Sequence, residues 1–429
     1  MKQKALITSG KLLSFAIKKL NLGNGSTWPG HLALSANKHF IKDILANSQT
    51  KIVFIVGTNG KTTTTSILRH ILTTDQKKVI QNISGANLLN GLASTLLLNA
   101  STNGQMNADI ALFEIDENVL PLASREIKPD MIIMLNLFRD QLDRYGEVNS
   151  IATKWQKNLS QLPAKTVLVL NADDPQIAYL GKDSLQKVFY FGLPNDTPGT
   201  TVHEHAADSL YCPNCGKKLI FSKVFYSHLG LWACSNCSFK RPKTVADSSP
   251  SYPLEGTYNK ANVHAASLAA SLLGVDEKVI TSALHTFTPA FGRQETLSIK
   301  GKKATIILVK NPTGFNEALR TVNKLHARHL MLVLNDRVAD GRDVSWIWDV
   351  DFEMIKNFSE IPVILSGDRA LDLSVRMKYS NVESIVASTI EEGLRLAFSS
   401  LPKGDTLYIL PTYTAMLDVR KILTGKKIL

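Results

Sequence analysis

The stretch KIVFIVGTNGKTTTTS, residues 51–66, joins a short apolar run to two glycines, a lysine and a block of hydroxyl side chains. The run from Ile52 to Val56 is rich in β-branched residues, which favours a buried parallel strand, and the apolar spacing after the glycines favours a helix. Gly57 and Gly60 let the backbone turn its N–H groups toward phosphate oxygens at the positive end of that helix. The stretch therefore predicts a phosphate-binding loop, with a simple glycine turn beside an exposed lysine as the alternative.

The predicted loop assigns nucleotide-binding roles to the residues between strand and helix. Lys61 is placed to reach the β- and γ-phosphates, and Thr62 to hold Mg²⁺ through its hydroxyl group. Ile55 stands where the longer form of this motif has its first glycine, so the shorter Gly-Thr-Asn-Gly-Lys-Thr carries the prediction. The candidate nucleotide-binding residues are Gly57, Thr58, Asn59, Gly60, Lys61, Thr62 and Thr63.

The composition is that of a globular protein with excess positive charge. The chain has 429 residues, enough for two or three domains, with a net charge of +12 and a pI near 9.3. The charge points to an anionic partner: nucleic acid, a phosphorylated substrate or an acidic membrane surface. Because the apolar runs are too short to cross a bilayer and the start lacks a leader pattern, we expect a cytoplasmic protein.

An N-terminal segment, 1–45, precedes the loop. It begins with MKQKALITSGKLLSFAIKKL, where apolar residues recur at helical spacing between lysines. Such a helix can lie on the inner membrane surface or pack on the following domain, and packing is the favoured interpretation.

After the loop, apolar runs alternate with helical patterns, as in ADIALFEID (108–116), MIIMLNL (131–137) and TVLVLNADD (166–174). This alternation predicts a parallel sheet covered on both faces, with ligands at the carboxyl ends of the strands. Hard oxygen ligands for Mg²⁺ are available at such ends. The carboxylates that follow these strands are Glu114, Asp116, Asp140 and Asp143, and Asn136 lies beside them in the sequence.

Several segments resemble the Mur ligases and folylpolyglutamate synthases, which join an amine to a carboxylate using ATP. The loop itself is one, and NLFRDQLDRYGEV at 136–148 is another. LEGTYNKANVHAASLAA at 254–270 matches the family pattern Gly-x-[His/Tyr]-Asn-x-x-Asn-x-x-Ala-Ala throughout, and TFTPAFGRQE at 286–295 is similar to its Gly-Arg-x-Glu.

This resemblance implies ATP and Mg²⁺ as cofactors and carries roles onto matching residues. Glu114 takes a magnesium-binding role, Asn259 contacts the nucleotide, and Arg293 binds the ATP phosphates as a planar donor. The alternative for Arg293 is a surface arginine in a hinge loop. The chain departs from the family pattern at two missing histidines and one missing carbamylated lysine, at Gln141, Tyr145 and Trp155, so those roles stay unassigned.

The four cysteines fall as CPNC at 212–215 and CSNC at 234–237. This spacing is typical of a four-thiolate zinc ribbon, and disulfides are disfavoured in a cytosolic chain. The ribbon, over about 203–245, interrupts the nucleotide domain, and a closed site would stabilise structure or dock a partner. The zinc ligands are predicted to be Cys212, Cys215, Cys234 and Cys237, with a redox dithiol as the alternative.

From about residue 297 the strand and helix pattern restarts, which predicts a second α/β domain. Its segments NDRVADGRDVSWIWDVDFE (335–353), SGDRALDLSVRMKY (366–379) and LPTYTAML (410–417) resemble the Mur-ligase-like subunits of lipid II isoglutaminyl synthase, which act with a glutaminase of the GatD type. This resemblance implies an ATP-dependent amide ligase of peptidoglycan synthesis. It would activate the α-carboxylate of D-glutamate in the lipid II stem peptide as an acyl phosphate and amidate it with ammonia to D-isoglutamine.

Two other functions stay open: a stand-alone ligase that adds an amino acid, and a zinc-ribbon NTPase that binds nucleic acid. Against the second, no basic segment is interleaved with aromatic residues, so a nucleic-acid partner is not expected.

The predicted ribbon uses every cysteine, so no thiol is left to release ammonia from glutamine. We therefore expect a heterodimer with a glutaminase subunit. Asp349, between aromatics in SWIWDVDFE, is a candidate catalytic residue that would orient the partner's histidine. The alternative is that Asp349 or Asp351 caps a helix beginning at DFEMIKNF.

The sequence thus predicts an α/β protein with an ATP-binding central domain of the Mur-ligase type over 46–296. A C-terminal α/β domain follows over 297–429. Lys61 and Asp349 are the candidate catalytic residues.

Overall fold

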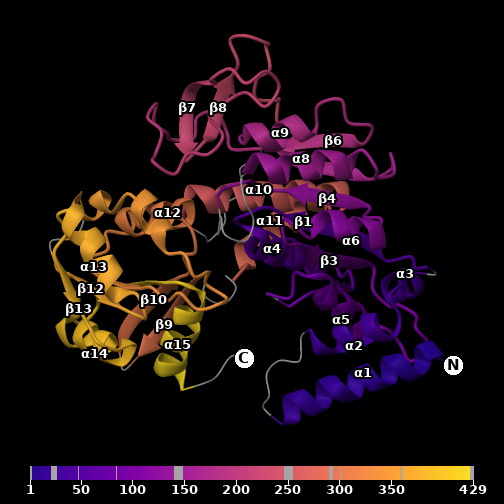
Figure 1. The fold of residues 1–429 in the computed structure, drawn as a ribbon, viewed down its shortest axis with the longest axis horizontal. Coiled ribbons are helices and arrows are strands. Elements are labelled where there is room, and N and C mark those ends of the chain that lie inside the picture. The colour runs from indigo at the N-terminus through magenta and orange to yellow at the C-terminus, as the bar shows by residue number, and fades with distance from the viewer. Residues whose placement is uncertain are drawn as a thin grey trace.

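Two six-stranded sheets organise the computed structural model, one in each half of the chain (Figure 1). The structure describes residues 2–20, 27–46, 48–83, 85–139, 148–245, 255–288, 293–299, 301–357, 359 and 361–425. Asp140, Gln141, Asp143 and Tyr145 lie outside this described part. None of the described helices combines the length and the apolar character needed to cross a bilayer.

The central sheet is parallel, as predicted, with the strand order β2-β3-β1-β4-β5-β6. β1, the strand of the phosphate loop, lies in the middle, where both its neighbours are parallel strands. The strands are β1 Lys51–Val56, β2 Val79–Gln81, β3 Ile110–Glu114, β4 Met131–Met134, β5 Val167–Asn171 and β6 Lys187–Phe191.

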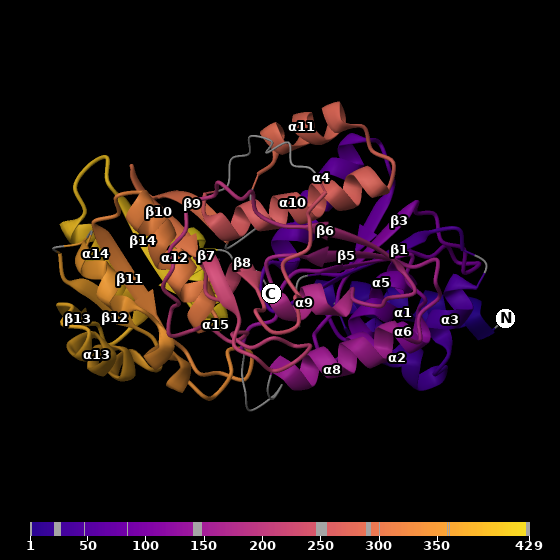
Figure 2. The same cartoon turned by 90° about the horizontal axis from the view of Figure 1, so that it is seen from above.

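Side chains of β1 alternate between the two faces of this sheet because the period of a strand is two. Val53 and Ile55 face one core, while Phe54 and Val56 face the other. The first core is closed by α4 Lys61–Thr74, α10 Thr257–Leu272 and α11 Glu277–Thr286 (Figure 2). The second is closed by α5 Leu89–Asn99, α6 Leu120–Glu126, α8 Val148–Leu159 and α9 Pro175–Leu180.

Three N-terminal helices form an outer layer on α5: α1 Lys2–Lys19, α2 Trp28–Ala36 and α3 Phe40–Leu45. The helices α2 and α5 approach closely at Gly30, where a Cβ atom would lie 1.9 Å from the Asn90 carbonyl oxygen. Ile7 of α1 and Phe40 of α3 are fully buried in the same core. The prediction that the N-terminal helix packs on the domain is confirmed.

A small antiparallel hairpin, β7 Ile220–Tyr226 and β8 Leu229–Ala233, projects from the central domain at the top of Figure 1. It carries the four cysteines at one end. Trp232 of β8 is buried against Ala178 of α9, and its indole Nε1 donates to the Ala172 carbonyl oxygen at 3.1 Å. The hairpin is therefore fastened to the carboxyl end of β5.

The second sheet has the order β13-β12-β11-β14-β10-β9, and only β9 is antiparallel to its neighbour among the described strands. The strands are β9 Arg293–Ile299, β10 Lys302–Ile307, β11 His329–Val333, β12 Val363–Ser366, β13 Ser384–Val386 and β14 Thr406–Pro411. This sheet confirms the predicted second α/β unit.

Helices cover both faces of the second sheet. On one face lie α12 Pro312–Lys324, α13 Ala370–Tyr379 and two 3₁₀ helices, η1 Ser345–Asp349 and η2 Phe352–Asn357. On the other lie α14 Ile390–Ser400 and α15 Tyr413–Thr424. The start of α12 points toward the central domain, which brings it to the phosphate loop.

Candidate active site

The loop between β1 and α4 has the backbone that its glycines predict. Gly57 and Gly60 have φ values of 137° and 90°, which disfavour any residue with a Cβ atom. At Gly60 a Cβ atom would also lie 2.2 Å from the Asn262 side-chain oxygen. Both glycines are thus required by the turn, and the second also by the close approach of α10.

Lys61 begins α4 and folds its side chain back over the loop. Its Nζ donates to the Gly57 carbonyl oxygen and lies 3.3 Å from a carboxylate oxygen of Glu117. Both partners are buried, so each charge compensates the other. The sequence analysis did not single out Glu117, although it follows β3 three residues after Glu114.

Thr62 and Glu114, the two predicted magnesium ligands, are in direct contact. The Thr62 hydroxyl donates to the Glu114 carboxylate at 2.9 Å, at the carboxyl end of β3. One hydroxyl and one carboxylate offer the hard oxygen ligands that Mg²⁺ prefers, so these residues fit that ion.

Asn136, which follows β4, holds the backbone of the loop. Its side chain accepts from the Asn59 backbone N–H at 2.8 Å and donates to the Asn59 carbonyl oxygen at 3.0 Å. Thr58 is held by the same segment, because its hydroxyl accepts a hydrogen bond from the Phe138 backbone N–H at 3.0 Å. The carboxyl end of β4 therefore fixes the shape of the loop.

The second domain contacts the loop through a pair of amides. Asn59 and Asn311 exchange two side-chain hydrogen bonds of 3.1 and 3.0 Å. Asn311 also caps α12 by accepting from the Gly314 N–H at 2.8 Å. We call this reciprocal pair the amide clasp.

A pocket with about 70 Å³ of free space, partly open to solvent, lies between the two domains beside the clasp. The central domain contributes loop residues and aromatic rings, and the second domain contributes α12 and the residues before it. Lining residues include Gly60, Thr63, Phe138, Tyr226, Tyr258, Asn262, Lys310 and Glu317.

Two residues carried over from the family lie differently with respect to this cavity. Asn259 is buried, and its amide donates to the Glu255 carbonyl oxygen at 2.6 Å, while Asn262 one turn later lines the cavity. Arg293 begins β9, but its side chain lies outside the described part of the structure. The next residue, Gln294, has a φ of 63° and donates to Glu255 at 2.8 Å, which ties the start of the second sheet to α10.

Glu317 is a buried carboxyl group on the cavity wall. Burial raises its pKa to about 7, against the opposing effect of its ion pair with Arg320. Arg320 also contacts Glu204 at 2.8 Å. Sequence reasoning missed Glu317, because nothing in a helical pattern distinguishes a buried glutamate from a solvated one.

Asp349 is the last residue of η1 and is half-exposed, 3.6 Å from the Arg139 guanidinium. Residues 345–349 form this 3₁₀ helix although apolar and polar residues alternate toward the end of SWIWDVDFE. Asp351 is held internally, because it accepts from Asn316 at 3.1 Å and contacts His205 at 2.8 Å.

The four cysteine sulfurs lie within 4.8 Å of one another. The pairs Cys212 with Cys237 and Cys215 with Cys234 are each 3.5 Å apart. That spacing is close to the S···S separation around a tetrahedral ion with Zn–S bonds of about 2.3 Å. Both loops also turn through a residue of positive φ directly after the second cysteine, Gly216 or Ser238. The cluster therefore fits a four-thiolate zinc site.

Trp155, at the position left unassigned, is fully buried. Its indole Nε1 donates to the Glu117 carbonyl oxygen at 2.8 Å. It therefore positions the backbone of the residue that pairs with Lys61.

Two family models match the chain. Residues 55–270 match the model described as Mur ligase middle domain, and residues 308–416 match that described as MurT ligase C-terminal. Among curated proteins, the lipid II isoglutaminyl synthase (glutamine-hydrolyzing) subunit MurT of Staphylococcus aureus is 33% identical over 414 residues, covering 91% of each chain. The protein of the same name from Streptococcus pneumoniae is 32% identical over 444 residues, covering 98% of this chain and 97% of its own.

Solved structures share the fold at lower identity. A pseudomurein peptide ligase type C from Methanothermus fervidus superposes with a TM-score of 0.67 at 24% identity, covering 90% of this chain and 81% of that one. The MurF ligase of Thermotoga maritima, solved with ADP, gives a TM-score of 0.62 at 15% identity, covering 92% and 83%.

Proposed function

The chain belongs to the MurT family of Mur-type ligases, and on that basis we propose that it is the synthetase subunit of a glutamine-hydrolysing amidotransferase. Its substrate is the D-glutamate of the lipid II stem peptide, whose α-carboxylate becomes the amide of D-isoglutamine. The names of the relatives motivate the substrate. The observation that carries the chemistry is a phosphate loop and a second α/β domain that face each other across one cavity.

The proposed reaction has two steps. The carboxylate oxygen attacks the γ-phosphorus of ATP, which gives an acyl phosphate and ADP. Ammonia then attacks the carbonyl carbon, a C–N bond forms, the C–O bond to phosphate breaks, and the nitrogen loses a proton. Positioning and electrostatics supply most of the rate in such transfers.

Residues of the loop have distinct roles in this proposal. Lys61 neutralises charge on the transferred phosphoryl group and exchanges its contact with Gly57 for the phosphate. Thr62 and Glu114 hold Mg²⁺, which supplies charge neutralisation at the phosphates when bound. The backbone N–H groups that follow Gly57 bind phosphate oxygens. Asn259 and Arg293 remain proposed nucleotide contacts on the strength of the family pattern.

Ammonia is supplied by a separate glutaminase subunit of the GatD type in this proposal. At neutral pH ammonia is mostly protonated and not nucleophilic, so direct delivery from glutamine is an advantage. Within the described part of the chain, all four cysteines gather in one cluster and none lines the pocket beside the phosphate loop, which supports an external thiol nucleophile.

Asp349 is the proposed contact with that partner's catalytic histidine. It adjoins a patch of exposed apolar side chains, in which Trp348 stacks edge-on against Tyr379 at 5.4 Å between ring centroids. Leu371 and Val375 extend the patch along α13. An exposed apolar patch beside a carboxylate suits a protein partner whose histidine needs an acidic residue to orient it.

The test is amidation of a lipid-linked muropeptide followed by mass spectrometry. The chain with ATP and ammonium alone should replace one OH by NH₂, and glutamine should serve only when the glutaminase is added. A product that gains an amino acid would support the stand-alone ligase instead. Nucleic acid binding that falls steeply with salt would support the NTPase alternative.

A further inference from the structure

The outer face of the N-terminal helical layer is apolar. Leu12, Phe15 and Leu20 follow one side of α1 and its end, and Trp28 begins α2. Their exposed fractions are 63, 64, 66 and 63% respectively. Large apolar side chains rarely gather on an exposed surface without a function.

This exposed face is not a poorly seated core face, because the opposite side of α1 is already packed. Ile7 is fully buried and Ser14 nearly so. At Gly10 a Cβ atom would lie 2.6 Å from the side chain of Leu97, which shows how closely α1 approaches α5. The register of α1 is therefore fixed by the core, and the outward row is a second apolar face.

Positive charge predominates on this layer. The first 42 residues contain no carboxylate and seven lysines: Lys2, Lys4, Lys11, Lys18, Lys19, Lys38 and Lys42. The first carboxylate, Asp43, accepts a hydrogen bond from Asn37 at 2.8 Å. Residues 79–108, which include the underlying α5, also contain no carboxylate.

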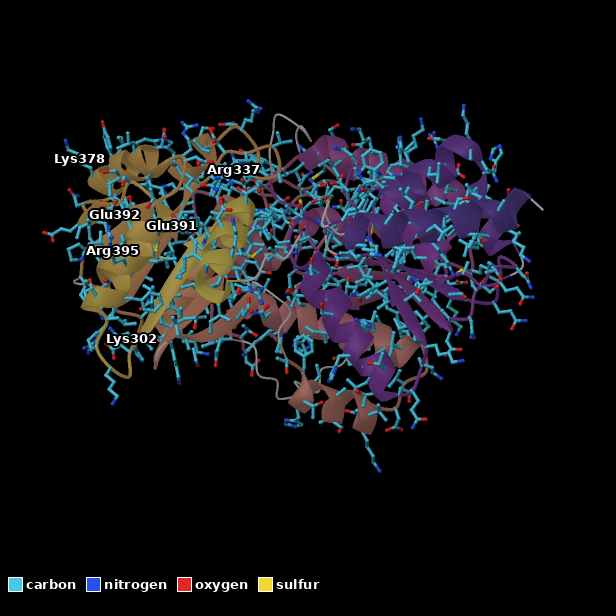
Figure 3. The ribbon with its side chains drawn as sticks, turned by 90° about the horizontal axis from the view of Figure 1, so that it is seen from below. Lys302, Arg337, Lys378, Glu391, Glu392 and Arg395 are labelled. Atoms are coloured by element: carbon cyan, nitrogen blue, oxygen red, sulfur yellow. The ribbon has the colours of Figure 1, made fainter. Side chains whose placement is uncertain are left out.

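Elsewhere the surface carries both signs. The far end of the second domain shows Lys302, Lys378 and Arg395 among Glu391 and Glu392 (Figure 3). The net charge of +12 is thus unevenly distributed, and the apolar row lies where carboxylates are absent.

We propose that the outer face of α1 and α2 binds peripherally to a bilayer that contains anionic phospholipid. Helices with an apolar face and flanking lysines lie in the plane of the interface, and tryptophan favours the headgroup level. Lysine side chains can extend along the apolar surface to reach lipid phosphates. Lys4 and Lys19 are exposed at the two ends of the row.

Charge also argues against the other occupants of such a face. A two-fold contact with a second copy of the chain would bring the same lysines together. A nucleic acid would use the lysines but not Leu12 or Phe15. In Figure 1, α1 lies at the opposite end of the central domain from the β7–β8 hairpin, so the surface leaves the zinc cluster clear of the membrane.

The experiment is sedimentation of the full chain with phosphatidylcholine vesicles, with and without phosphatidylglycerol. Wild-type protein should bind the anionic vesicles, and Leu12→Glu with Phe15→Glu should weaken binding by about tenfold or more. The matched control, Leu185→Glu with Val202→Glu, adds the same charge at exposed apolar side chains elsewhere and should bind nearly as wild type. If the first variant unfolds, Lys4→Glu with Lys19→Glu replaces it.

The proposal would be overturned by no binding of wild type to anionic vesicles, by equal loss in both variants, or by a dimer in gel filtration that only the first variant dissociates. Binding that RNA abolishes while phosphatidylglycerol has no effect would also overturn it. The surface does not depend on the proposed activity. Amidation of a water-soluble muropeptide tests that activity separately, and the Leu12 and Phe15 variants should leave it unchanged.

Discussion

Lys61 combines the proposed contact with the ATP phosphates with a buried ion pair to Glu117, and the two can be separated. We expect Lys61→Ala to lower ATP-dependent turnover at least about a hundredfold, because a preorganised cation on the phosphoryl group is lost. The buried Glu117 is then left without its partner, so a destabilisation on the order of 1 to 3 kcal/mol should accompany the loss. Turnover and thermal melting measure the two effects. Lys77→Ala, an exposed lysine next to Asp75, is the control.

If Lys61→Ala turned over at the wild-type rate, the assignment of the loop to ATP would fail. A change in thermal stability could not produce a wild-type rate, so the turnover measurement decides whether the assignment holds.

The role of Asp349 can be tested by comparing amidation from the two nitrogen sources, glutamine and ammonium. We expect Asp349→Asn to abolish amidation driven by glutamine while leaving amidation driven by added ammonium within about twofold, since only the partner's histidine loses its orienting carboxylate. Asp351→Asn is the matched control. Because Asp351 is bound by Asn316 and His205, its loss should lower stability and affect both assays alike. Equal loss of both activities in Asp349→Asn, with the complex still formed, would rule out the role.

Glu317 makes stability depend on pH. Its pKa is about 7 in the folded protein against the usual 4.5, so the folded state holds a proton that the unfolded state releases. Stability should therefore fall as pH rises through this window, by roughly 3 kcal/mol at most. In Glu317→Gln this fall is absent. Urea unfolding at pH 5 and pH 7.5 measures the free energy of unfolding of wild type and variant. The advantage of wild type over Glu317→Gln should shrink or reverse at the higher pH.

The control is Glu383→Gln at an exposed position, whose free energy of unfolding should differ from wild type by the same amount at both pH values. The same pH-independent difference for Glu317→Gln would refute the effect.

Individual residues divide into those that the sequence identifies and those that it does not. The positions of Lys61, Thr62 and Glu114 were predictable, because a loop motif and the ends of parallel strands specify them in advance, while their roles stay predictions. Asn311 was not, because its contact with Asn59 crosses from one domain to the other. No local pattern records a contact between residues so far apart in the chain.

The hairpin with the four cysteines is the element whose stability should depend on a ligand, because the sulfurs fit a zinc ion. We expect Cys212→Ser, or treatment with a chelator, to increase amide hydrogen exchange throughout β7 and β8 while the phosphate-loop strand stays protected. Stability should fall by a few kcal/mol, with a smaller change in ammonium-driven turnover. Hydrogen exchange by mass spectrometry and a zinc assay provide the measurements. Ser222→Ala, on the same hairpin, is the control.

Purified protein without zinc, but with the same exchange protection, would contradict a structural metal.

Helices and strands differ in how well their own sequences predict their structure. The strands around β1 were predictable, because their apolar runs are buried on both faces and carry little ambiguity. η1 was not, since SWIWD alternates in composition yet forms a 3₁₀ helix in which Ile347 is buried among α12 and α13 side chains. There the surrounding domain overrides the local pattern.

At the scale of the whole molecule, the amide clasp joins the phosphate loop to the second domain. Asn311→Asp keeps the oxygen that caps α12 but loses the donor to Asn59, and it adds a charge at a position that is 1% exposed. We expect it to lower turnover by about tenfold and to lower the melting temperature, since the buried carboxylate faces the Asn59 oxygen without a hydrogen bond between them. Small-angle scattering should report a more open average arrangement. Asn323→Asp, near the end of the same helix, is the control.

An unchanged rate together with an unchanged scattering profile would show that the clasp has no role in bringing the domains together.

The fastening of the ribbon to β5 has a consequence for the cell. Trp232 is bonded to Ala172, two residues before Asp174, and the Asp174 carboxylate accepts from the Leu137 N–H at 2.9 Å. Leu137 follows Asn136, which shapes the phosphate loop. If the four thiolates hold zinc, the supply of zinc to the cell then affects the nucleotide site. In chains made during zinc starvation, the hairpin would no longer hold the segment from Ala172 to Asp174 in place, and these chains would be degraded sooner. Quantifying the intact chain in zinc-depleted cultures would test whether the supply of a micronutrient limits the amount of working enzyme.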